Sequence, residues 1–224
     1  MVSYKLIRSS RKTLAIYIRD GFVEVRAPLK LPKAEIDRFV LSKEKWIAEK
    51  LSQSRERLEK RASFTLSYGD CVTYRGKEYP ITRRNGDRVG FDDVSFYIPP
   101  DLSLKEIKCA CIQIYRMLAK HDLLQKTYEY SRIMTVMPSA VRINGAKSRW
   151  GSCSTQKSVN YSWRLIMADD EVIDYVVVHE LAHLTEPNHS PRFWALVQGV
   201  LPDYVARQAR LKELQKRLGA EDWD

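Results

Sequence analysis

Three of the four histidines lie within eleven residues of one another, in a pattern that can bind a metal ion. His179 and His183 are four residues apart and belong to an HExxH motif whose second residue is Glu180. On an α-helix, residues four apart lie on one face, so the two imidazoles can converge on a single ion. Glu180 projects beside them and can accept a proton from water without binding the metal. A random order of the same residues contains the motif with a probability of roughly 0.004.

Such a site needs a third ligand, and His189 is a candidate that lies six residues after His183, outside the first helix and just before the next. Its separation from His183 equals that between the second and third histidines of HExxHxxGxxH motifs, although Glu186 replaces the glycine. Two other interpretations stay open. A carboxylate from the following helix can be the ligand instead, and the candidates are Asp203 and Glu213. Alternatively, His189 only caps a helix that begins at Ser190.

The ligand set predicts the chemistry. Three neutral histidines leave one position of Zn²⁺ for water, whose pKa then falls to about 7. We therefore expect one Zn²⁺ per chain, with other divalent metals as alternatives. Glu180 would take the proton of this water as the water attacks a carbonyl or phosphoryl centre, and would pass it to the leaving group. The candidates for stabilising the developing oxyanion are Arg149, Arg164 and Tyr204.

A helix must position the motif, and the sequence predicts one from Asp169 or Asp170 to about Leu184. The motif follows Val176-Val177-Val178, and β-branched residues of this kind disfavour helices unless core packing stabilises them. A buried helix is also where a rigid metal site places its ligands. Two further helices are expected, one starting at Ser190-Pro191 and one running from Pro202-Asp203 to near Gly219.

The first hundred residues read as a β-rich region that contains one long helix at about 32–61. Alternating segments flank Asp20-Gly21 and predict a hairpin. A second hairpin is expected around Gly76-Lys77 and a third at Asp92-Asp93. Pro99-Pro100 then ends the sheet. This pair of prolines predicts a boundary between two domains, 1–100 and 101–224.

The second predicted domain opens with a capping box, Ser103-Leu-Lys-Glu106, and a helix that continues towards Tyr130. Strand-like segments follow at 140–144 and 158–166. The fold class expected for the whole chain is therefore α+β, with a small sheet beside the HExxH helix in the second domain.

The composition and charge of the chain indicate a globular protein with a basic surface. The 224 residues are 44% hydrophobic and 29% charged, as in ordinary globular proteins. The formal charge is +10, and it is concentrated in segments 1–61 and 102–164, each with a net charge of +8. A basic surface suits anionic substrates, and nucleic acid is one candidate partner. We expect no membrane span and a cytoplasmic protein, because no long apolar stretch or signal core is present and the four cysteines form no CxxC pair.

Several longer motifs resemble the YgjP-like metallopeptidase-domain family, whose members are often described as predicted metal-dependent hydrolases. The motifs are Arg149-Trp-Gly-Ser-Cys-Ser154, Trp163-Arg-Leu165, the segment 172–184, Asn188-His-Ser190 and Phe193-Trp194, with weaker similarity at 11–16 and 25–28. The resemblance implies a zincin-like catalytic domain with His179, His183 and His189 as metal ligands and Glu180 as the general base. It also implies that the strand Val159–Ile166 borders the substrate cleft. The chain departs from the usual Leu-Asn-Trp of the family at Tyr161-Ser-Trp163.

Three functions follow from these patterns. The first is a zinc-dependent hydrolase of the metallopeptidase type. The second is a nucleoside triphosphate pyrophosphatase at the same site, because some relatives are described as acting on uridine triphosphate. This function would need Lys147 or Arg149 to bind phosphate. The third is a DNA-associated protease similar to SprT and WLM proteins, or a nucleic-acid-binding module whose zinc is structural and has Cys153 as its fourth ligand.

Overall fold

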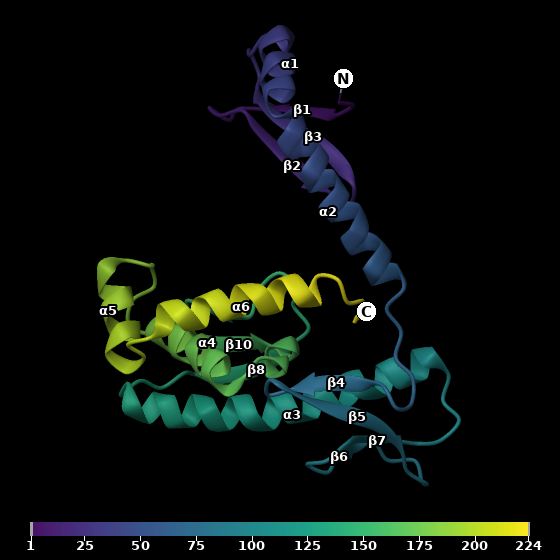
Figure 1. Ribbon diagram of the computed structural model, residues 1–224. Helices are drawn as coiled ribbons and strands as arrows, with labels where there is room; N and C mark the ends of the chain where they lie inside the picture. The colour runs from purple at the N-terminus through teal and green to yellow at the C-terminus, as the bar shows by residue number, and fades with distance from the viewer. Residues whose placement is uncertain (1, 224) are drawn as a thin grey trace. The chain divides into compact units, whose positions relative to one another are not determined.

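The computed structural model describes residues 2–223 and has an α+β fold (Figure 1). It divides into two compact units. The N-terminal unit comprises the residues up to Phe64 together with Arg217–Asp222, and the C-terminal unit comprises Thr65–Lys216 together with Trp223. Among the described helices, none is both long enough and apolar enough to cross a membrane.

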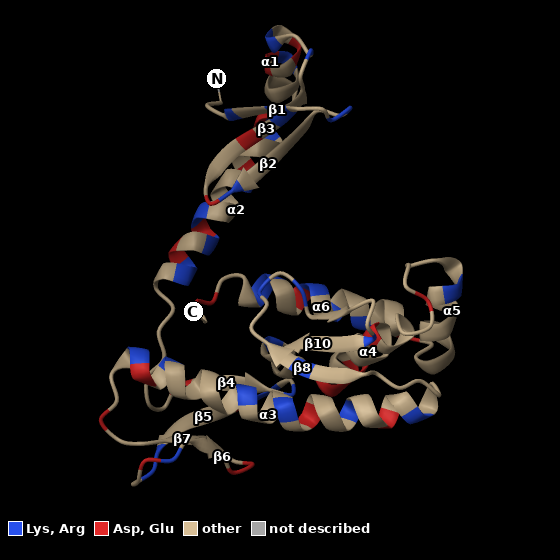
Figure 2. Cartoon of the chain, turned by 180° about the vertical axis from the view of Figure 1, so that it is seen from behind, with Lys and Arg blue, Asp and Glu red and all other residues tan. Residues whose placement is uncertain are grey.

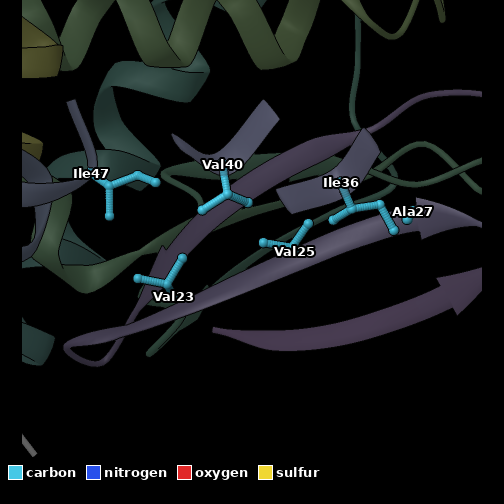
Figure 3. Close-up of a cluster of buried hydrophobic side chains, with 6 residues drawn as sticks. All are labelled: Val23, Val25, Ala27, Ile36, Val40 and Ile47. Atoms are coloured by element: carbon cyan, nitrogen blue, oxygen red, sulfur yellow. The ribbon is translucent and has the colours of Figure 1, made fainter. Parts of the chain in front are cut away.

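The N-terminal unit is a three-stranded sheet packed against two helices. The strand order is β1-β3-β2, formed by β1 (Lys5–Ser9), β2 (Ala15–Arg19) and β3 (Phe22–Pro28). The predicted hairpin at Asp20-Gly21 is confirmed, and both turn residues have positive φ, as tight hairpin turns require. One face of β3 supplies Val23, Val25 and Ala27 to the core of this unit (Figure 3).

The long helix predicted at about 32–61 is wrong in one respect, because the structure has two helices here. They are α1 (Lys33–Ser42) and α2 (Glu44–Ala62). Lys43 between them leaves the helical region, with φ −110° and ψ 12°. The break allows Ile36 and Val40 of α1 and Ile47 of α2 to reach the same core (Figure 3).

The C-terminal unit begins with a four-stranded sheet in the order β4-β5-β7-β6. Its strands are β4 (Cys71–Tyr74), β5 (Lys77–Arg83), β6 (Gly90–Phe91) and β7 (Phe96–Ile98). This sheet packs on α3 (Leu104–Ile133), where the Tyr115 hydroxyl donates to the carbonyl of Thr73 and the Tyr115 ring lies 5.1 Å from that of Phe96. The compact unit therefore starts after Phe64 rather than at Pro99-Pro100, because residues on both sides of the prolines share one core.

The C-terminal unit contains a second sheet, whose strands follow α3 in the sequence. This sheet has the order β8-β10-β9, formed by β8 (Ala140–Asn144), β9 (Gly151–Cys153) and β10 (Ser158–Ser162). The strand predicted at 158–166 is therefore too long. The chain turns into the 3₁₀ helix η1 (Trp163–Met167), whose five side chains are all buried.

Three helices follow η1, namely α4 (Asp170–Ala182), α5 (Pro191–Val200) and α6 (Tyr204–Leu218), and all but the last two residues of α6 belong to the C-terminal unit. The Asp169 side chain caps α4 by accepting from the backbone N–H of Val172. Val176, Val177 and Val178 are all buried, so core packing stabilises a run of poor helix formers, as predicted. This buried helix carries the HExxH motif.

Candidate metal centre

The imidazoles of His179, His183 and His189 converge on one point. Their ring nitrogens supply a group of potential ligand atoms that all lie within 4.8 Å of one another. The Nε2 atoms of His179 and His189 are 3.0 Å apart. Two nitrogens bound to one tetrahedral zinc ion at about 2.0 Å lie about 3.3 Å apart, so the observed spacing fits such an ion.

Local structure explains why the three rings meet. His179 lies in the last turn of α4, and His183 is the C-cap residue of that helix, one turn later. The ring nitrogen Nδ1 of His183 lies 3.1 Å from the backbone carbonyl oxygen of Glu186, which leaves Nε2 to face the cluster. His189 immediately precedes the N-cap of α5, where the Ser190 side chain accepts from the N–H of Phe193.

The electrostatics of the histidines also fit a cation. Burial, followed by the neighbouring His183 and His189, lowers the pKa of His179 to about 3. Burial lowers the pKa of His183 as well. Both rings are therefore neutral near pH 7, which is the form that binds metals. The second ring nitrogen of His179, Nδ1, is buried and has no hydrogen-bond partner among the described residues.

Glu180 lies beside this cluster as a buried carboxyl group. The residue is only 6% exposed to solvent. Burial raises the pKa of Glu180 to about 7, and the positive charge of Arg149 opposes the rise. A carboxyl group with such a pKa can both accept and release a proton near neutral pH.

A cleft of about 660 Å³ opens onto the three histidines and Glu180. Its other wall is β9, which lies at the edge of the sheet among the described strands and pairs there with β10. The remaining lining residues come from the segments around β9 and after α4, and they are Gly151, Ser152, Cys153, Ser154, Thr155, Lys157, Leu184 and Pro187. The segment expected to border the cleft is Val159–Ile166, but none of its residues lines it. This segment forms most of β10, the central strand of the sheet, and most of η1.

Comparison with known families agrees with this architecture. A family model described as the YgjP-like metallopeptidase domain matches residues 12–214. The chain belongs to the YgjP-like family. The match spans both compact units and includes the three histidines and Glu180. Among curated proteins, none matches the chain significantly.

Two solved structures are similar to part of this YgjP-like chain. One is the metallopeptidase zymogen abylysin of Pyrococcus abyssi, at 21% identity and a TM-score of 0.38, covering 45% of this chain and 98% of that one. The other is the zymogen jannalysin of Methanocaldococcus jannaschii, at 22% identity and a TM-score of 0.38, covering 43% and 97%. Both similarities extend over less than half of the YgjP-like chain.

The other sequence-predicted residues of this YgjP-like domain lie outside the cluster. Arg164 is 8% exposed and donates to the backbone carbonyls of Gly145 and Trp223. The Tyr204 ring stacks on Trp194, at 5.2 Å. None of the four candidates for binding the substrate or oxyanion lines the cleft, namely Lys147, Arg149, Arg164 and Tyr204. Of these, Arg149 acts on Glu180 through its charge.

The alternative metal ligands are also placed elsewhere. Asp203 accepts from Arg207 at 2.9 Å, and Glu213 pairs with Lys216 at 2.7 Å. Cys153 lines the cleft, but its sulfur is not part of the group of converging ligand atoms. Among the described residues, the only such group consists of the three histidines.

Sequence reasoning missed one residue that touches the general-base candidate. Gly151 lies so close to Glu180 that a Cβ atom at this position would be 2.5 Å from both Cγ and Oε1 of Glu180. Its place within the Arg149–Ser154 motif was the available signal. A glycine in a strand often marks close approach of another group.

Proposed function

We propose that this chain is a metal-dependent hydrolase in which His179, His183 and His189 hold a divalent cation, zinc in the first instance. Glu180 is the proposed general base. The convergence of three imidazoles and a buried carboxyl group on one open cleft is the observation that carries the proposal. Membership of a family named for a metallopeptidase domain supports the same reaction class.

The cation, Glu180 and Arg149 would have different roles in the reaction. A divalent cation in this site would supply Lewis acidity, which polarises a carbonyl group and makes water more acidic. Glu180 takes a proton from the attacking water and delivers it to the leaving amine. Its raised pKa, about 7, suits both steps because the two protonation states differ little in free energy near neutral pH. Arg149 keeps the carboxylate form accessible by opposing the effect of burial.

The strand edge that lines the cleft favours a peptide as substrate. Gly151, Ser152 and Cys153 of β9 line the cleft, and β9 has one of its two sides paired, with β10. An extended peptide can add to such an edge through main-chain hydrogen bonds. This would hold a scissile peptide bond alongside Glu180 and the histidines.

A nucleotide substrate has less support. Triphosphate recognition needs several cations or backbone N–H groups. The cleft is lined by one basic residue, Lys157. Six of the eleven Lys and Arg residues in segment 102–164 lie on α3 instead, where Figure 2 shows them interspersed with acidic residues. A structural zinc closed by Cys153 is also disfavoured, because its sulfur lies outside the converging group.

The test combines metal analysis with a substrate panel. Purified protein should contain about one zinc per chain, and it should cleave unstructured polypeptides in a reaction that a chelator stops. Glu180→Gln should retain the zinc and lose at least about 100-fold in kcat. Glu213→Gln, an exposed carboxylate in α6, is the matched control and should behave as wild type.

The nucleotide arm of the panel uses uridine triphosphate with Zn²⁺, Mg²⁺ or Mn²⁺. Pyrophosphate release that is lost in Glu180→Gln, with no peptide cleavage, would assign the site to nucleotides. Hydrolysis that survives Glu180→Gln would refute the proposed general base.

A further inference from the structure

His189 is held differently from the other two histidines. It is exposed and lies between two helices, whereas His179 and His183 are half-buried on or at the end of α4. A metal-binding histidine is usually oriented by a hydrogen bond from its second ring nitrogen. His183 has such a partner in the carbonyl of Glu186. Among the described residues, His189 has a ring hydrogen-bond contact only with His179. The Nδ1 atom of His179 also has no partner among these residues, but that atom is buried, whereas His189 is exposed.

An aromatic stack takes the place of the missing hydrogen bond. The ring of Trp194 in α5 lies nearly parallel to that of His189, at 5.7 Å between centroids and 25° between planes. Trp194 is in turn nearly parallel to Tyr204 at the start of α6, at 5.2 Å and 19°. Both separations are within the range for offset stacking. Three rings from three parts of the chain are thus aligned.

Trp194 does not itself face the substrate space, because neither Trp194 nor Tyr204 lines the cleft. Phe193, the preceding residue, is fully buried. Its ring centroid lies 4.5 to 4.9 Å from the ring centroids of all three histidines. Phe193 therefore packs against all three histidine rings and does not distinguish His189 from the other two. Trp194 makes its parallel contact with His189 and meets His179 at 6.0 Å and a steep angle of 61°. Its stacking contact is specific to the third histidine.

We propose that Trp194 is the positioning residue for His189. Its indole holds the imidazole in the plane in which Nε2 faces Nε2 of His179, and Tyr204 supports the indole from α6. The inference rests on the proposed function in one respect, namely that His189 is a metal ligand. Without the stack, the exposed imidazole would have to lose its rotational freedom each time a metal binds, which weakens binding.

The test measures zinc affinity by competition with a chromogenic chelator. Trp194→Leu should weaken zinc binding about tenfold, as is typical when a group that orients a metal ligand is lost. Trp194→Phe keeps an aromatic ring and should stay within about threefold of wild type. Trp46→Leu, at a half-exposed tryptophan of α2, is the matched control and should not change the affinity. The absorption spectrum of the Co²⁺-loaded protein gives a second readout, since its visible bands depend on ligand geometry and should change in Trp194→Leu alone.

A double-mutant cycle separates positioning from a general loosening of the fold. In a His189→Ala background, Trp194→Leu should cause no further loss of zinc affinity, because the ring that it orients is gone. An equal tenfold loss in both backgrounds would overturn the proposal, as would wild-type affinity in Trp194→Leu. If wild-type protein binds no zinc, the metal centre itself is refuted. If it binds zinc and Trp194→Leu does so equally well, only the role of Trp194 is refuted.

Discussion

Replacing Glu180 by Gln should change the stability of the metal-free protein in a way that depends on pH. Glu180 is buried beside the histidine cluster, and burial raises its pKa from 4.5 to about 7. Gln has nearly the same shape and carries no charge at any pH. The comparison therefore isolates the free energy of placing one carboxylate in this site.

The sign and size follow from linkage. The folded protein binds the Glu180 proton more tightly than the unfolded chain does, so this group stabilises the fold fully below pH 4.5. That contribution is lost as the pH rises towards and through about 7. A pKa difference of this size corresponds to about 3 kcal/mol. The stability of Glu180→Gln relative to wild type should therefore increase by about 3 kcal/mol between pH 4.5 and pH 8.5.

Urea unfolding in EDTA, followed by tryptophan fluorescence, measures this difference. Four of the five tryptophans lie in the C-terminal unit, so the signal reports on the unit that contains Glu180. Glu213→Gln is the matched control, and we expect its stability to differ from wild type by less than about 0.5 kcal/mol throughout. A difference between Glu180→Gln and wild type that does not change with pH would refute the reasoning, since it would mean that the carboxyl group is not buried in the metal-free protein.

Three further predictions concern the same cluster. Gly151→Ala should push the Glu180 side chain away by about 1 Å and lower kcat about 100-fold with zinc affinity unchanged, whereas Gly199→Ala, which meets no atom within 4 Å, should leave kcat unchanged. Equal kcat in both variants would contradict the close approach. Cys153→Ser should bind zinc with wild-type affinity in chelator competition, because the sulfur lies outside the ligand group, and a large loss would support a structural zinc. Zinc at a thousand times its Kd should stabilise wild type by about 4 kcal/mol in thermal unfolding but not His183→Ala, and equal stabilisation of both would place the ion elsewhere.

The local parts of the site could be predicted from the sequence. The spacing of His179 and His183 determines their alignment, because an α-helix brings residues four apart to one face. The valines before the motif correctly indicated a helix stabilised by core packing. Hairpin turns are equally local, and Asp20-Gly21 adopts the positive φ values that its residue types allow.

Choices between distant residues could not be made in this way. His189, Asp203 and Glu213 were all suitable third ligands by type, and only the path of the chain between α4 and α5 brings His189 to the other two. By residue type, Arg164 is a candidate for stabilising an oxyanion, but in the structure it donates to the backbone carbonyl of Trp223, 59 residues later. Contacts of this kind depend on packing between elements, which residue spacing does not encode.

The placement of two imidazoles and a carboxyl group on one helix, and the family to which these motifs belong, follow from the order of the residues alone. The residues that surround these three side chains are known only from the three-dimensional fold. The fold places β9 at the cleft instead of β10, Gly151 against Glu180, and Trp194 beside His189. The reason is physical, because helical periodicity acts over a few residues, whereas strand order and side-chain packing depend on the burial of the whole unit.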